Sequence, residues 1–125
     1  MFKSLGQVII YVKDQEIAKN FWLEKAGFHL VSELEFGPGM KAIEIAPQKD
    51  VPTTLVLHNK DIIAKMQPEL NLGTPSLMFY CENLEGLYEK LKNSGVTVGD
   101  LVTMPTARVF NFSDDEGNYF AVREK

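Results

Sequence analysis

Hydrophobic and polar positions follow the same order twice along the chain. Each copy begins with an apolar, β-branched or aromatic run that is typical of a strand, over residues 7–14 and again over residues 76–83. A helical pattern follows each run and stops at a glycine, Gly27 in the first copy and Gly95 in the second. A duplicated strand-helix unit predicts a pseudo-symmetric domain with a site between its halves.

Capping residues and apolar stripes define the two expected helices. Asp14 is the expected N-cap of a helix over about residues 15–26, and Asn83 caps the helix of the second half. In both helices apolar side chains recur at the spacing of one helix face, which predicts one apolar stripe on each helix. The stripes are Ile17, Ala18, Phe21 and Trp22 in the first helix, and Leu84, Leu87, Tyr88 and Leu91 in the second.

Turn residues divide the remainder of each half into strands. In the first half we expect strands near 28–36, 40–46 and 53–58, with Gly37 to Gly39 as a turn. Gly117 and Asn118 predict a hairpin turn near the end of the second half, because both tolerate positive φ. The expected strands of the second half lie near Val96–Val98, Leu101–Met104, Arg108–Phe112 and Tyr119–Glu124.

These elements predict an α+β fold in which two tandem β-α-β-β-β modules form a curved mixed sheet around a cleft. One domain would span residues 1–125, with module 1 over about 1–58 and module 2 over about 74–125. Residues 59–73 form the connector, in which residues 61–66 are expected to make a short helix.

Composition and charge exclude several function classes. The chain has a net charge of −4, and its 13 basic residues are scattered, which argues against nucleic acid and anionic membrane surfaces as partners. No apolar run is long enough to span a membrane, and the N-terminal segment lacks a signal-peptide pattern. Cys81 is the only cysteine, so an internal disulfide is excluded. We therefore expect a cytoplasmic protein.

Several short motifs together resemble a known family. Val12-Lys13-Asp14, Phe21-Trp22 and Ala26-Gly27-Phe28 occur in the order and spacing of signatures of the vicinal oxygen chelate superfamily. Residues 113–118 resemble the hairpin of that family, with Asp115 in place of a proline. The group includes glyoxalase I, extradiol dioxygenases and bleomycin-resistance proteins. The resemblance covers nearly the whole chain and implies a homodimer with a pocket near the module or subunit interface.

The resemblance also implies where a metal would bind. Metal-dependent members of the family carry four ligands, which map onto Gln7, Val56, Ser76 and Ala121 of this chain. Valine and alanine cannot coordinate a metal, and a neutral serine hydroxyl is a poor ligand, so no metal or other cofactor is expected. A shifted strand register would leave open one divalent metal ion held by Gln7, His58 and either Glu44 or Glu124.

Alternation from the mapped positions predicts a mostly apolar cleft with a few polar points, which is typical of a small-molecule site. His58 is either a pocket base or a partly exposed residue at a strand end, and Arg108 pairs either with an anionic ligand or with a surface acid. The expected ligand-binding residues are Gln7, Ile9, Tyr11, Val56, His58, Ser76, Met78, Tyr80, Asn111, Tyr119 and Arg108.

Three functions are compatible with this sequence. The first is metal-independent binding of a small, partly apolar molecule in the cleft, as in resistance proteins that sequester their ligand. The second is a metal-dependent enzyme, either a glyoxalase-like lyase or a dioxygenase, which needs a divalent ion. The third is a structural or regulatory dimer whose cleft is filled by side chains.

Overall fold

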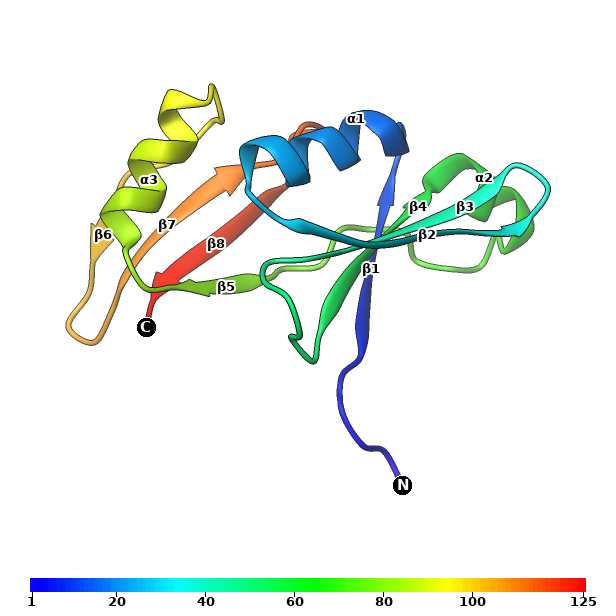
Figure 1. The fold of residues 1–125 in the computed structure, drawn as a ribbon, viewed down its shortest axis with the longest axis horizontal. Coiled ribbons are helices and arrows are strands. Elements are labelled where there is room, and N and C mark those ends of the chain that lie inside the picture. Colours follow the sequence, from blue (N-terminus) through cyan, green and yellow to red (C-terminus); the bar gives the residue numbers. More distant parts are fainter. The chain divides into compact units, whose positions relative to one another are not determined.

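The same strand order occurs twice in the computed structural model, which describes residues 1–125 (Figure 1). The chain divides into unit 1, Met1–Thr74, and unit 2, Pro75–Lys125. Each unit builds its own four-stranded mixed sheet and follows the order β-α-β-β-β, with the short connector helix at the end of unit 1. The predicted α+β fold of two such modules is confirmed.

The two sheets have equivalent topology. In unit 1 the order is β1-β4-β3-β2, and in unit 2 it is β5-β8-β7-β6. The first strand of each unit pairs in parallel with the last, and the other pairs are antiparallel. The strands are β1 Gln7–Val12, β2 His29–Gly37, β3 Met40–Ala46, β4 Thr54–Asn59, β5 Met78–Cys81, β6 Val102–Thr103, β7 Arg108–Ser113 and β8 Tyr119–Glu124.

The helices begin at the predicted caps. Helix α1 (Gln15–Asn20) starts after Asp14, whose side chain accepts hydrogen bonds from two backbone N–H groups, and continues as a π-helical turn, η1 (Phe21–Lys25). Helix α3 (Leu84–Asn93) starts after Asn83 in the same way. The connector contains α2 (Lys60–Met66), as expected from its sequence. These caps satisfy backbone donors that the first helical turn leaves without intrahelical partners.

In unit 1 the hydrophobic core lies on the face of the sheet that α1 covers (Figure 1). Trp22 is fully buried and packs against Phe21 and Phe28, with ring centroids 5.4 and 4.8 Å away. The amide of Gln15 donates hydrogen bonds to the backbone oxygens of Lys41 and Leu57, which fastens α1 to β3 and β4. Gln15 therefore links the helix to the sheet, and Trp22 fills the core beside it.

In unit 2 a cluster of aromatic rings forms the core. Phe110 and Phe120 are almost fully buried, and the ring of Tyr88 from α3 meets Phe110 edge-on at 5.2 Å. The predicted hairpin turn between β7 and β8 is confirmed, with Gly117 at a φ of 82°. Asp114 organises this turn, because its carboxylate accepts hydrogen bonds from the backbone of Glu116 and from both the backbone and the side chain of Asn118.

One strand predicted for unit 2 is absent, and a second is shorter than predicted. Residues 96–98 form no strand and contribute only the isolated bridge of Val98 with Phe112, and the strand expected over 101–104 is reduced to Val102–Thr103. Gly99 interrupts the first segment and donates its N–H to the oxygen of Asn111, and Pro105 has no N–H with which to extend the second. The strand at this edge of the unit 2 sheet, β6, is therefore very short.

No helix of this chain combines the length and the apolar character that a membrane crossing requires.

Candidate functional site

The face of the unit 1 sheet opposite α1 is open and largely apolar. Side chains alternate along β1, so that Ile10 and Val12 are buried beneath the helix, whereas Gln7, Ile9 and Tyr11 point to the other side. We call this side the open face of unit 1. Strand pairing adds neighbours from β2, β3 and β4, which are Ser32, Leu34, Phe36, Ala42, Glu44, Thr54, Val56 and His58.

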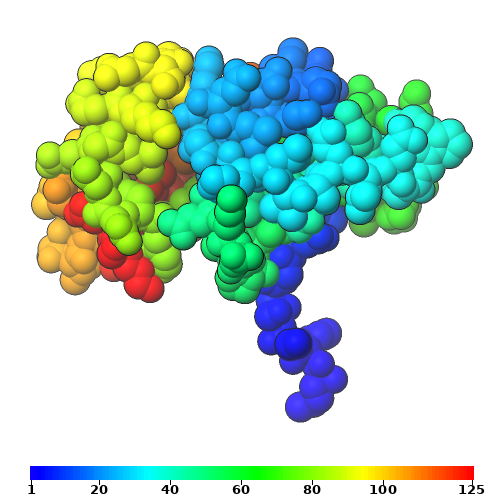
Figure 2. Space-filling model, in the orientation of Figure 1, coloured from blue at the N-terminus to red at the C-terminus, as the bar shows by residue number.

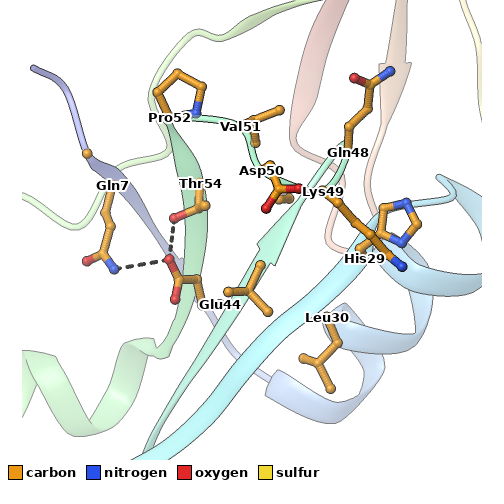
Figure 3. A pocket seen from close by; sticks show the side chains of 13 residues that line it. Gln7, His29, Leu30, Glu44, Gln48, Lys49, Asp50, Val51, Pro52 and Thr54 are labelled. Carbon is orange, nitrogen blue, oxygen red and sulfur yellow. Dashed lines mark hydrogen bonds between the residues drawn. The ribbon is translucent and has the colours of Figure 1, made fainter.

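Glu44 is the centre of a polar cluster at one end of the open face. Its Oε2 accepts hydrogen bonds from Thr54 Oγ1 at 2.6 Å and from Gln7 Nε2 at 3.3 Å (Figure 3). Its Oε1 accepts one from Ser32 Oγ at 3.3 Å. We call Gln7, Ser32, Glu44 and Thr54 the acidic end. The three donors come from three different strands, and together they restrict the rotamer of one carboxylate.

A pocket of about 680 Å³ opens beside the acidic end (Figure 3). Gln7, Glu44 and Thr54 line one side, and His29 and Leu30 at the start of β2 line another. The loop over residues 48–52 completes the wall. This volume lies within the range that is usual for small-molecule sites. The lining mixes apolar side chains, such as Leu30 and Val51, with polar and charged ones.

Aromatic rings gather at the other end of the open face. The ring of His58 lies between Tyr11 and Phe36, with centroid distances of 6.1 and 5.3 Å. Desolvation by burial lowers the pKa of His58 below its ordinary value of 6.5, so its imidazole is neutral at pH 7. We call Tyr11, Phe36 and His58 the aromatic end. It offers flat, uncharged surface for stacking.

Strand register fixes the spacing of the two ends. Glu44 pairs with Val56, and His58 is two residues further along the same face of β4. At the usual rise of an extended strand, the acidic and aromatic ends are therefore roughly 7 Å apart along β4. A molecule of ordinary drug size could contact both.

The alternative metal ligands do not converge. Gln7 pairs with Thr54, whereas His58 pairs with Tyr11 four positions further along the strands, which corresponds to roughly 13 Å. The structure contains no group of three or more His, Cys, Asp or Glu side chains that could hold a metal ion. Val56 is buried and, like Ala121, offers no ligand atom. The residues present do not fit a divalent ion at the mapped positions.

Unit 2 has an open face of its own. Met78, Tyr80 and Tyr119 are more than half exposed on it, at 51, 60 and 59%. Ala121 pairs with both Met78 and Asn111, which places the side chain of Asn111 on the same face. Ser76 is exposed just before β5 begins. Four of the expected ligand-binding residues therefore share one side of the sheet, which are Met78, Tyr80, Asn111 and Tyr119, whereas Ser76 lies outside the strands.

Arg108 lies on the opposite side of β7. Its guanidinium contacts Glu85 Oε1 at 2.6 Å, and Glu124 Oε2 lies 3.9 Å away. The sequence left two roles open for Arg108, and the structure contains one of them, the ion pair with a surface acid. Its charge is already matched by neighbouring carboxylates.

Cys81 is unsuited to act as a nucleophile. Burial raises the pKa of its thiol, and the negative charge of Glu124 raises it further. The thiol is therefore protonated at neutral pH.

The sequence analysis considered Glu44 only as an alternative metal ligand and did not identify the loop over 48–52. A signal for Glu44 existed, because it is the one acidic residue in the otherwise apolar run from Ala42 to Ala46. Alternation places it on the face opposite Ile43 and Ile45, both fully buried. The cleft expected between the halves stays a prediction.

Comparison with known proteins gives one consistent result. The family model described as the glyoxalase/bleomycin resistance protein/dioxygenase superfamily matches residues 4–122. The uncharacterized protein YetH of Bacillus subtilis (strain 168) is 38% identical over 125 residues, which cover 99% of this chain and 100% of YetH.

Two solved structures from Streptomyces sp. CB03234 share the fold and part of the sequence. TnmS3, described as an antibiotic binding protein, is 27% identical with a TM-score of 0.82, and the match covers 98% of this chain and 96% of TnmS3. A glyoxalase/bleomycin resistance protein is 28% identical with a TM-score of 0.76, and the match covers 95% of this chain and 98% of that protein.

Proposed function

Since the chain belongs to the glyoxalase/bleomycin resistance protein/dioxygenase superfamily, we propose that it binds a small, partly apolar molecule without the help of a metal ion. The molecule lies on the open face of unit 1. The proposal concerns binding alone, and no chemical step is assigned to the chain.

The observation that carries this proposal is the composition of the open face of unit 1. The face combines exposed apolar side chains, including Leu34 and Phe36, with a single carboxylate that three hydrogen bonds hold in place. Such a face gains free energy when an apolar ligand covers it, at about 25 cal/mol for each Å² removed from water. The polar points fix the orientation of the ligand.

The comparison with TnmS3 supports a ligand of the antibiotic type. TnmS3 is described as an antibiotic binding protein and shares the fold over nearly the whole chain. Fold alone does not determine function, so this likeness guides the choice of compounds. Natural products with planar aromatic groups are the first class to screen.

The proposal of metal-independent binding rests on the ligand set. A catalytic divalent ion normally needs about three protein ligands and an open position. The positions Gln7, Val56, Ser76 and Ala121 supply at most one good ligand. The spacing of Gln7 and His58 supports the same proposal.

A thermal-shift screen in EDTA tests the proposal. A ligand that binds only the folded protein raises its melting temperature, and at one hundred times its Kd it adds about 2.7 kcal/mol of stability. We expect hits among planar, partly apolar compounds. Phe36→Ala at the aromatic end weakens those hits, whereas Ile17→Ala, which removes an exposed side chain from α1, does not.

Two outcomes would overturn the proposal. One is the absence of any stabilising compound in a broad screen. The other is stoichiometric retention of Ni, Zn, Mn or Fe after desalting, with retention lost in His58→Ala, because this would place a metal at the site and favour a lyase or dioxygenase.

A further inference from the structure

We infer that the ligand carries a cationic group, which Glu44 binds, and a planar apolar group, which lies at the aromatic end. This inference rests on the proposed function and narrows it to amphipathic cations. It is carried by the surroundings of Glu44 and by the spacing of the acidic and aromatic ends.

Glu44 has no cationic partner within its own unit. Its three hydrogen-bond donors, Gln7, Ser32 and Thr54, are all neutral. Two other carboxylates of unit 1 do have cationic partners, since Glu33 contacts Lys19 at 2.7 Å and Glu16 contacts Lys41 at 3.0 Å. A half-buried carboxylate without a counter-charge attracts a cation more strongly than a solvated one does.

The other charged groups of the pocket do not neutralise Glu44. Lys49 and Asp50 belong to the loop of the wall and carry opposite charges. His29 also lines the pocket, and the formal net charge of the chain counts both histidines as neutral. Because the charges of Lys49 and Asp50 cancel, the negative charge of Glu44 remains. The pocket therefore favours a positively charged ligand.

Glu44 also retains capacity for one more hydrogen bond. A carboxylate offers about four acceptor positions, two on each oxygen. Oε2 accepts from Gln7 and Thr54, whereas Oε1 accepts only from Ser32. A protonated amine can donate to the free position of Oε1 without displacing a protein donor. Because the carboxylate is already held, little side-chain entropy is lost on binding.

The aromatic end suits the second part of such a ligand. Tyr11, Phe36 and His58 present ring surfaces, and the lowered pKa of His58 keeps its imidazole uncharged at pH 7. A neutral ring does not repel a nearby cation. The separation of roughly 7 Å along β4 then sets the minimum distance between the amine and the ring of the ligand.

A matched series of small probes tests this inference on the intact chain. The probes are primary arylalkylamines whose linker grows one methylene at a time, their neutral N-acetyl derivatives, and carboxylates of the same length. We measure Kd by calorimetry in EDTA. The amine of best length should bind about tenfold more tightly than its N-acetyl derivative, because a charge-assisted hydrogen bond replaces a neutral one.

Glu44→Gln keeps the shape of the side chain and removes its charge, so it should abolish the preference for the amine. Glu35→Gln is the matched control, since Glu35 is exposed on β2 and outside the open face. It should retain the preference. If Glu44→Gln does not fold, the ratio of amine to N-acetyl affinity in the unmodified chain decides the question.

The outcomes separate the inference from the proposed function. Equal affinity for amines and N-acetyl derivatives, unchanged in Glu44→Gln, would overturn the role of Glu44 and leave the proposed function intact. Tighter binding of the carboxylates would overturn it as well. If no probe binds and no compound of the thermal-shift screen stabilises the chain, both the inference and the proposed function fail.

Discussion

The open face of unit 1 carries a carboxylate, whereas the open face of unit 2 carries cations. In unit 1, Glu44 is held by neutral donors. In unit 2, Arg123 pairs with Tyr80 across the sheet, and Lys125 Nζ lies 4.6 Å from the centroid of the Tyr80 ring. Both sheets have the same strand order, so topology does not determine this chemistry.

The sheet faces that the helices cover differ much less between the two units than the open faces do. Both consist of large apolar side chains that are almost fully buried, such as Trp22 in unit 1 and Phe120 in unit 2. Burial of each such side chain contributes about 1.5–3 kcal/mol. The repeated sequence pattern thus preserves the core of the module, whereas the charged side chains of the two open faces differ. Residues 1–5 are exposed and project from the rest of unit 1 (Figure 2).

The largest expected effect concerns the two cores. Trp22→Ala and Phe120→Ala should each lower the free energy of unfolding by about 3–5 kcal/mol, because each leaves a large cavity. Denaturant unfolding followed by circular dichroism measures the loss. Tyr80→Ala is the control, since Tyr80 is mostly exposed, and it should cost about 0.5 kcal/mol or less. A small effect at one core position alone would show that the cores are not equivalent.

The second-largest expected loss of stability concerns the hairpin turns, which differ between the two units. Asp114→Ala should lower the free energy of unfolding by about 1–3 kcal/mol, because Asp114 is buried and accepts three hydrogen bonds within the β7–β8 turn. The β2–β3 turn relies instead on Gly39, which has a φ of 72°. Gly39→Ala should be destabilising through backbone strain. The melting temperatures of Asp114→Ala and Gly39→Ala measure how far each turn depends on its residue. Asp115→Ala is the comparison for Asp114→Ala.

A histidine-dependent pH effect is expected from unit 1 alone, since both histidines belong to it. The pKa of His58 is lowered on folding, so the unfolded chain binds a proton at a higher pH than the folded chain does. The contribution of His58 to stability is therefore complete above about pH 6.5 and is lost as the pH falls below that value. Melting temperatures between about pH 5 and pH 8 measure this dependence.

His58→Phe should flatten the pH profile. An identical pH profile in the parent chain and in His58→Phe would contradict the assignment of this pH dependence to His58. Steeper loss of stability at still lower pH is expected from carboxylates such as Glu16, whose pKa is lowered chiefly by its hydrogen bond with Lys41.

The smallest effect concerns the surface ion pair of unit 2. Arg108→Ala should change the free energy of unfolding by about 1 kcal/mol or less, because its contact with Glu85 is solvent-accessible. Ligand affinity should not change, since Arg108 lies on the helix side of β7. A double-mutant cycle with Glu85→Ala measures the pair, and a large loss of ligand affinity would return Arg108 to the binding site.

Local features of the fold were predictable from sequence, and the acidic end was not. The caps Asp14 and Asn83 and the turn at Gly117 depend on a few neighbouring residues, so short motifs identify them. The cluster around Glu44 depends on β3 and β1 both pairing with β4, which is a long-range relation. The two-residue β6 was overestimated because apolar sequence alone does not guarantee a pairing partner. A homodimer and a cytoplasmic location stay predictions.

The most direct test of the account is a titration of the EDTA-treated protein with the best compound of the screen, followed by NMR of backbone amides. We expect saturable binding, with the largest shift changes on the open face of unit 1, around Ile9, Phe36, Glu44 and His58. Binding that requires added metal, or shift changes that leave this face unaffected, would contradict it.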